Sequence, residues 1–153
     1  MEKNLQNLDL TLVKIKLMDT EEGQGWTKEQ CEIAELEYKR FLNLIYVFKN
    51  AVPTKAIDIF WHQHILDTRA YAEDSIRLFG EFLHHFPYFG MFGEEDNQNL
   101  IDSFEQTKHR YKELYGEELD RANGFSADYN KCHTCHNQCS HCNHPLSSNQ
   151  FLN

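Results

Sequence analysis

The sequence has few basic residues, no long apolar run and little cysteine before its C-terminal end. Only 15 lysine and arginine residues stand against 24 aspartate and glutamate residues, which gives the 153-residue chain a formal net charge of −9. This balance argues against a general nucleic-acid binder, which would carry a basic face. No apolar run approaches the roughly 18 residues of a membrane span, and no signal-peptide core is visible. We therefore expect a cytoplasmic protein with no nucleic-acid or membrane partner.

Four of the five cysteines lie together near the end of the chain. In a reducing compartment such a cluster favours metal binding over structural disulfides. The spacing is Cys-x2-Cys-x3-Cys-x2-Cys with four interleaved histidines, so four thiolates can close a tetrahedral zinc shell. The middle gap is far shorter than the roughly 12–20 residues of a usual zinc finger. The tail therefore indicates a zinc- or copper-binding segment rather than a folded finger, with Cys132, Cys135, Cys139 and Cys142 as its ligands.

Two other interpretations of the tail stay open. Residues 132–136 also match the C-x-x-C-H pattern of haem c attachment, which generally needs an exported chain. The tail can also be a disordered, redox-sensitive extension that holds no metal. The remaining cysteine, Cys31, is expected to be a buried apolar filler.

Capping residues and helical periodicity predict an all-α fold, a small bundle of about four helices. We divide the chain into an N-terminal arm over 1–25, a helical domain over 26–118 and an irregular tail over 119–153. Thr27 and Gln30 match a capping box at the start of the first helix of the domain. The expected helices run from Thr27 to about Phe48, from Thr54 through Trp61, from Asp67 or Thr68 to Gly80, and from Asp96 to Tyr115.

Apolar positions inside these segments predict which faces are buried. In the arm, an alternation between Leu8 and Leu17 indicates a short extended or helical segment. Its inward residues would be Leu10 and Leu12, with Ile15 and Leu17 as further candidates. In the third helix of the domain we expect the buried face to carry Ala72, Ile76, Phe79 and Leu83.

Two tight histidine clusters, each flanked by large apolar residues, are the strongest candidates for a site in the domain. They contain His62 with His64, and His84 with His85. Neutral imidazole is a good ligand for zinc, copper, iron or nickel. Asp58 and Asp67 stand near the first cluster, as ligands or as acceptors for the ring N–H of a ligand histidine. The alternative is that these histidines simply pack and form hydrogen bonds in a core.

Geometry limits how the clusters can meet. His62 and His64 would point to nearly opposite sides of one continuous helix, so they can share a metal only if the backbone breaks near them. The following helix is about 20 Å long, and the residues from Gly80 to His85 can retrace about 16 Å. We therefore expect a site around His62, His64 and a carboxylate. His84 and His85 join it only if the chain doubles back.

Two further residues are candidates for roles at this site. Glu37 falls within an apolar helical stripe, where an unpaired carboxylate costs several kcal/mol. It is either paired with Arg40 or a lysine, or it faces the histidines. Tyr71 is a candidate proton donor.

The chain resembles the glycine-rich domain-containing protein-like family of bacteria and plants. The resemblance covers about residues 26–118, and its most specific parts are Trp-His-x-His and the later Leu-His-His-x-Pro. The glycine-rich segment of the plant members is absent here. The similar positions are Trp26-Thr27, residues 37–42, Val52-Pro53, Asp58, residues 61–64, Asp67-Thr68, Tyr71, residues 83–85, Pro87, Thr107, Tyr111 and Tyr115-Gly116.

Three functions from different classes follow. The first is a metal-binding protein with a His/carboxylate site and a Cys/His tail, with zinc as the leading metal and iron or copper as alternatives. The second is a metal-dependent enzyme that activates water near His62 and His64, with Glu37 or Asp58 as base and Tyr71 as donor. The third is an interaction module that docks a protein partner on Trp61 and the aromatic residues 86–92, its histidines being structural. No nucleotide-binding fingerprint or Ser/His/Asp series can be assembled.

Overall fold

The computed structural model describes residues 2–119 and 125. Within these residues the chain forms six helices and no strand, which confirms the predicted all-α fold. None of the described helices combines the length and the apolar character needed to cross a membrane. The predicted metal ligands of the tail, Cys132 to Cys142, lie outside the described residues. The helices are α1 (Glu2–Gln6), α2 (Thr11–Met18), α3 (Lys28–Phe48), α4 (Lys55–Leu66), α5 (Thr68–Phe79) and α6 (Glu94–Tyr115).

The N-terminal arm is helical and belongs to the core. Helix α2 packs against α3 and α4, and α1 packs against α3. Leu10, Val13 and Leu17 are buried because they share one face at helical spacing, whereas Leu12 is 70% exposed and Ile15 is 55% exposed. Of the four predicted inward residues, only Leu10 and Leu17 therefore face the core.

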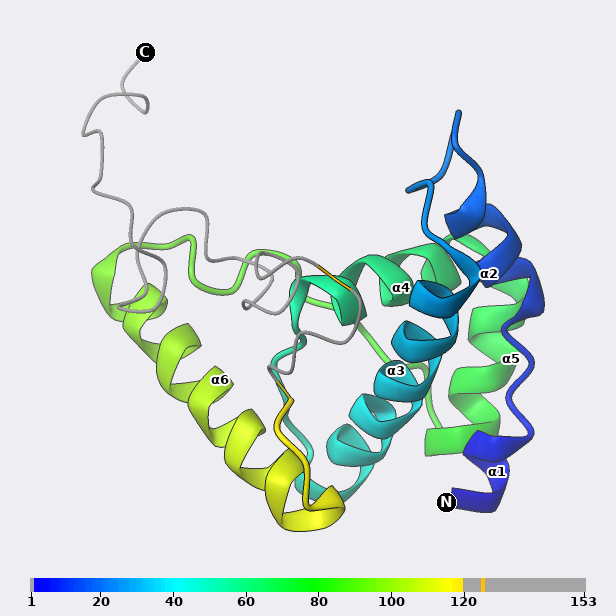
Figure 1. Cartoon of the computed structure of the whole chain (residues 1–153). Helices are drawn as coiled ribbons and strands as arrows, with labels where there is room; N and C mark the ends of the chain where they lie inside the picture. Colours follow the sequence, from blue (N-terminus) through cyan, green and yellow to red (C-terminus); the bar gives the residue numbers. More distant parts are fainter. Residues whose placement is uncertain (1, 120–124, 126–153) are drawn as a thin grey trace.

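Helix α3 is the centre of the packing. It contacts α1, α2, α4 and α6 and buries Tyr38, Phe41 and Leu44 completely. Its start is the predicted capping box: the Thr27 hydroxyl accepts the Gln30 backbone N–H, and the Gln30 side chain accepts the Thr27 backbone N–H. In Figure 1, α3 and α6 lie close together at their C-terminal ends and diverge from there.

Helices α4 and α5 are consecutive, are joined at Asp67 and pack against each other. Thr54 caps α4, as predicted, but the helix continues past Trp61 to Leu66. The Asp67 carboxylate caps α5 by accepting the Ala70 N–H at 3.4 Å, and Gly80 ends α5 in the left-handed conformation. The buried face of α5 carries Tyr71, Ser75 and Leu78. The predicted face was wrong at Ile76, which is 58% exposed, because packing on α4 selects a face that contains polar atoms.

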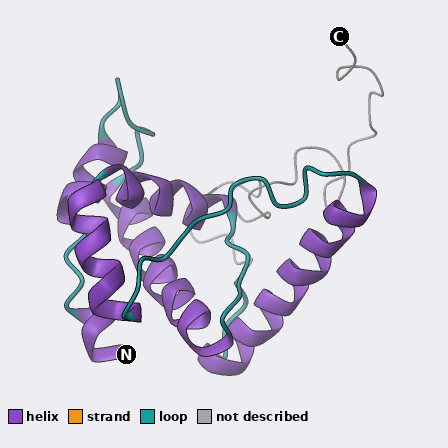
Figure 2. Cartoon of the chain, turned by 180° about the vertical axis from the view of Figure 1, so that it is seen from behind, coloured by secondary structure: helices purple, strands orange, loops and turns teal. Residues whose placement is uncertain are grey.

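The segment between α5 and α6 crosses the molecule to reach the far end of α6, as Figure 2 shows from behind. Its last part is fastened to α6 by Asp96, whose carboxylate accepts the backbone N–H groups of Gly90 and Phe92 at 2.7 and 3.1 Å. Gly90 has φ +88°, and a Cβ there would lie 2.6 Å from a methyl carbon of Leu100. Glycine therefore lets the segment approach α6 closely before it turns.

Candidate metal centre

Three potential metal ligands converge from two segments of the chain. Asp58 and His62 lie one turn apart on the same face of α4, and His85 comes from the segment after α5. His85 Nε2 lies 2.9 Å from Asp58 Oδ1 and 2.9 Å from His62 Nε2. The distance from His62 Nε2 to Asp58 Oδ1 is 3.7 Å. The structure thus joins one member of each predicted histidine cluster to a predicted carboxylate.

These distances suit a small metal ion. Zinc bonds of about 2.0–2.1 Å in a tetrahedral shell place neighbouring ligand atoms about 3.3 Å apart. The observed separations of 2.9 and 3.7 Å bracket that value. A single proton on His85 Nε2 can be directed well toward only one of its two neighbours. A metal ion would accept lone pairs from all three atoms together.

The group is buried on one side and open on the other. The side chains of Asp58 and His85 are 11% and 8% exposed, whereas that of His62 is 48% exposed. Asp58 also lies in the first turn of α4, where the helix dipole favours a carboxylate. Three protein ligands with an open side leave room for a further ligand, such as water.

A chain of contacts holds His85 against α4. The ring of His85 stacks on Trp61, with centroids 4.3 Å apart and planes at 27°. The Trp61 Nε1–H donates to the Tyr71 hydroxyl at 2.9 Å, and this hydroxyl donates to the Leu83 carbonyl at 2.6 Å. Leu83 is two residues before His85. Tyr71 therefore acts as a bridge that positions the chain carrying His85, and burial raises its pKa.

Removal of the Tyr71 hydroxyl tests this bridge. Tyr71→Phe should lower metal affinity by roughly 10–100-fold, the usual cost of losing a group that orients a ligand. The ring remains, so the helical content should not change. Tyr88→Phe removes an exposed hydroxyl from the same segment and should have no effect. Metal titration of both variants checks the prediction, and equal affinities would show that Tyr71 does not position His85.

His64 lies on the other side of α4 and joins a separate buried network. Its Nε2 lies 3.3 Å from Asp74 Oδ2, and its Nδ1 lies 3.0 Å from the Tyr38 hydroxyl. A carboxylate only accepts, so Nε2 carries the proton and Nδ1 accepts from Tyr38. Arg77 contacts the other oxygen of Asp74. Because α4 is continuous through both histidines, His62 and His64 do not meet.

The burial of this network shifts its titration. Burial lowers the pKa of His64 from its ordinary value of 6.5, although Asp74 and Asp67 oppose the shift. Burial also raises the pKa of Tyr38 well above its usual range. His64 is thus neutral and Tyr38 protonated at pH 7, which fits the hydrogen bonds described above.

The lowered pKa of His64 predicts a loss of stability in acid. Below pH 6.5 the unfolded state binds a proton at this residue more readily than the folded state, so the free energy of unfolding should fall as the pH drops through 6.5. Urea unfolding at several pH values measures the slope. His64→Gln should reduce the slope, whereas His109→Gln, which replaces an exposed histidine of α6, should keep it. Equal slopes in all three proteins would contradict the assignment.

The other candidate residues lie apart from the metal group. His84 is exposed, with its ring 4.9 Å from that of Phe82. Asp67 caps α5. Glu37 is 3% exposed and lies on α3, near Tyr111 of α6, whose pKa is raised chiefly by burial and further by the charge of Glu37.

Two contacts outside the metal group were not expected from the sequence. Arg40 pairs with Glu117 at 3.0 Å and donates to the Tyr111 hydroxyl. Asp74, the partner of His64, was also missed. No local spacing pointed to it, because the contact joins α4 to α5.

Comparison with known families identifies the family to which the chain belongs. A family model described as UCP032817-like matches residues 5–140. The chain belongs to the UCP032817-like family. Glycine-rich domain-containing protein 1 of Arabidopsis thaliana is 30% identical over 89 residues, which confirms the resemblance seen in the sequence. The aligned part covers 54% of this chain and only 11% of that protein. No solved structure matches the chain.

Proposed function

We infer that this member of the UCP032817-like family is a metal-binding protein. Its helical domain would hold one divalent transition-metal ion on Asp58, His62 and His85. The observation that carries this proposal is the convergence of three ligand atoms, all within 4.8 Å of one another, from two separate segments. Zinc suits two imidazoles and a carboxylate in a tetrahedral shell. Iron and copper are the alternatives, because two histidines and a carboxylate also hold non-haem iron.

The proposal includes a second metal site in the Cys/His tail. Its four cysteines lie outside the described residues, so this part rests on their spacing alone. A reducing compartment such as the cytoplasm would keep them as thiols, and metal binding would release their protons. The two sites differ in donor atoms, since the tail offers sulfur and the domain offers nitrogen and oxygen.

A metal-dependent enzyme is the second candidate, favoured by the open side of the site. Catalytic zinc sites keep three protein ligands and leave the fourth position to water, whose pKa the ion lowers. The exposed side of His62 provides such an opening.

Titration with cobalt tests the domain site without interference from the tail. The four-serine protein should carry Ser at Cys132, Cys135, Cys139 and Cys142, and also Gln at His133, His136, His141 and His144, so that the tail offers neither thiolate nor imidazole. One equivalent of Co²⁺ should bind and give visible absorption without thiolate-to-metal charge transfer. His62→Ala in this background should abolish the signal, and His109→Ala should preserve it. Failure of the four-serine protein to bind Co²⁺ or Zn²⁺ would overturn the proposal.

A further inference from the structure

A cavity of about 380 Å³ lies beside the metal group. It is bounded by the end of α3, residues 49–53, residues 83–89 and the middle of α6. His85 and Trp61 line it, so the proposed metal ligand also contributes to its wall. Its volume falls in the range of small-molecule sites, about 300–1,000 Å³.

The charged residues that line this cavity are both cations. Lys49 and Arg110 line it, and none of its described lining residues is an aspartate or glutamate. Within the described part of the chain, neither Lys49 nor Arg110 forms an ion pair with a carboxylate. Arg110 is held by neutral acceptors instead, since its Nη1 donates to the Asn50 carbonyl at 3.2 Å and to Asn50 Oδ1 at 2.7 Å. Although the protein has a net charge of −9, these two cations give the cavity a local positive charge that favours an anion.

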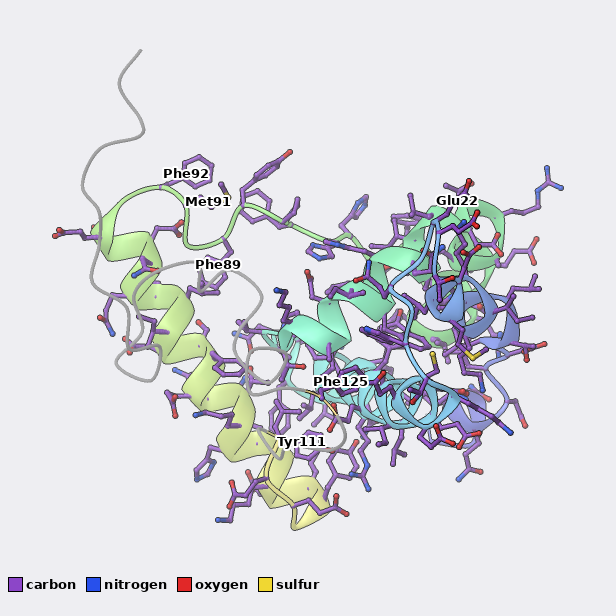
Figure 3. All side chains as sticks on the ribbon, turned by 45° about the horizontal axis from the view of Figure 1, so that its top comes forward. Glu22, Phe89, Met91, Phe92, Tyr111 and Phe125 are labelled. Atoms are coloured by element: carbon purple, nitrogen blue, oxygen red, sulfur yellow. The ribbon has the colours of Figure 1, made fainter. Side chains whose placement is uncertain are left out.

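The remaining wall is mostly apolar and aromatic. In Figure 3, Phe89 points inward from the segment before α6, whereas Phe92 points away from the molecule. Phe92 is 71% exposed, while Phe89 is partly buried and packs against the core. The ligand that fits such a wall has an apolar body. The larger apolar side chains of this wall include Ile45, Val52, Trp61, Leu83, Phe86 and Phe89.

We propose that this cavity binds a small organic acid with an aromatic or other apolar body, whose carboxylate is held by Lys49 and Arg110. The acid would lie next to His85, at the side of the metal group. Its role as a substrate or co-ligand of the metal rests on the proposed function, but its binding to the cavity does not. The proposal thus names small organic acids as the class of molecule that would bind beside the metal centre.

Three probes of similar shape, together with inorganic phosphate, test the proposal on the full chain freed of metal with EDTA. Calorimetry should show that phenylacetate binds at least about 10-fold more tightly than phenylacetamide, because hydrogen bonds to a charged group are stronger. Phenethylamine should not bind measurably. Inorganic phosphate, which has no apolar body, should bind at least about 10-fold more weakly than phenylacetate. Equal affinity for the acid and the amide, or no binding of the acid, would overturn the proposal.

Matched variants test whether Lys49 and Arg110 hold the carboxylate of the acid. Lys49→Gln and Arg110→Gln should each weaken phenylacetate binding by about 10-fold or more and leave phenylacetamide binding unchanged. Lys28→Gln and Arg69→Gln, which remove exposed cations outside the cavity, should change neither. Thermal unfolding checks that each variant is folded, and Lys49→Gln serves alone if the loss of Arg110 disturbs Asn50. Unchanged acid binding in folded Lys49→Gln would overturn the assignment.

Addition of zinc separates this proposal from the metal centre. If the four-serine protein takes up no zinc but binds phenylacetate through Lys49 and Arg110, the cavity assignment stands and the metal centre fails. If phenylacetate binds only after zinc is added, and Lys49→Gln and Arg110→Gln do not change its affinity, the metal holds the acid and the cavity assignment fails. Tighter binding of the acid in the presence of zinc, with the dependence on Lys49 kept, supports both.

Discussion

His85→Ala should lower the affinity of the helical domain for zinc by about 100-fold or more. It removes one of three ligands, which costs more than the roughly 10–100-fold typical of groups that only orient a ligand. His84→Ala is its matched control, because it removes a histidine from the adjacent position of the same segment without touching the metal group. The measurement is a competitive zinc titration in the four-serine protein, whose tail histidines are also replaced.

Three outcomes distinguish the arrangements that the sequence allowed. Loss of binding in His85→Ala alone agrees with the observed group. Loss in both variants would mean that His84 and His85 act together. Unchanged affinity in His85→Ala would remove this residue from the site and leave Asp58 and His62 without their third partner.

His64→Ala should lower the free energy of unfolding by about 2–4 kcal/mol and leave zinc affinity unchanged. The side chain is 3% exposed, so its removal leaves a cavity and takes away the acceptor of the Tyr38 hydroxyl and the donor to Asp74. Urea unfolding measures the first effect and zinc titration the second. His109→Ala, at an exposed position, should stay within about 0.5 kcal/mol of the parent.

A stable His64→Ala protein that has lost its zinc would contradict this division of roles. It would return His64 to the metal group, as the sequence had suggested. If His64→Ala does not fold, His64→Gln keeps the volume and a polar contact and allows the same zinc measurement.

Local sequence chemistry was enough to predict where α3 and α5 begin and end, where α4 begins and where α6 ends. Thr27, Thr54 and Asp67 cap helices because their side-chain oxygens accept nearby backbone N–H groups, a property of a few consecutive residues. Gly80 and Gly116 end α5 and α6 because glycine readily adopts positive φ. No tertiary information is needed for these features.

The buried faces were harder to predict because packing partners decide them. In α5 the apolar Ile76 is exposed, while Ser75 and Tyr71 are buried against α4. Hydropathy cannot anticipate this choice, since it follows from the hydrogen bonds that the Tyr71 hydroxyl makes with Trp61 and Leu83.

The site was predictable in its residue types and only partly in its grouping. The period of the helix already implied that His62 and His64 point apart, and the observed continuous α4 follows that rule. The choice between His84 and His85 depends on how the segment crosses Trp61. That is a long-range contact, so the sequence alone could not decide between the two histidines.

The separation of the ligands along the chain has a thermodynamic consequence. His62 and His85 are 23 positions apart, with the whole of α5 between them. Closing a loop of this length costs the unfolded chain conformational entropy, so the ion would be bound tightly only by the folded chain. It would stabilise the fold by about 2.7 kcal/mol at a free metal concentration 100 times the dissociation constant. The melting temperature of this domain would then report how much metal the surrounding solution supplies.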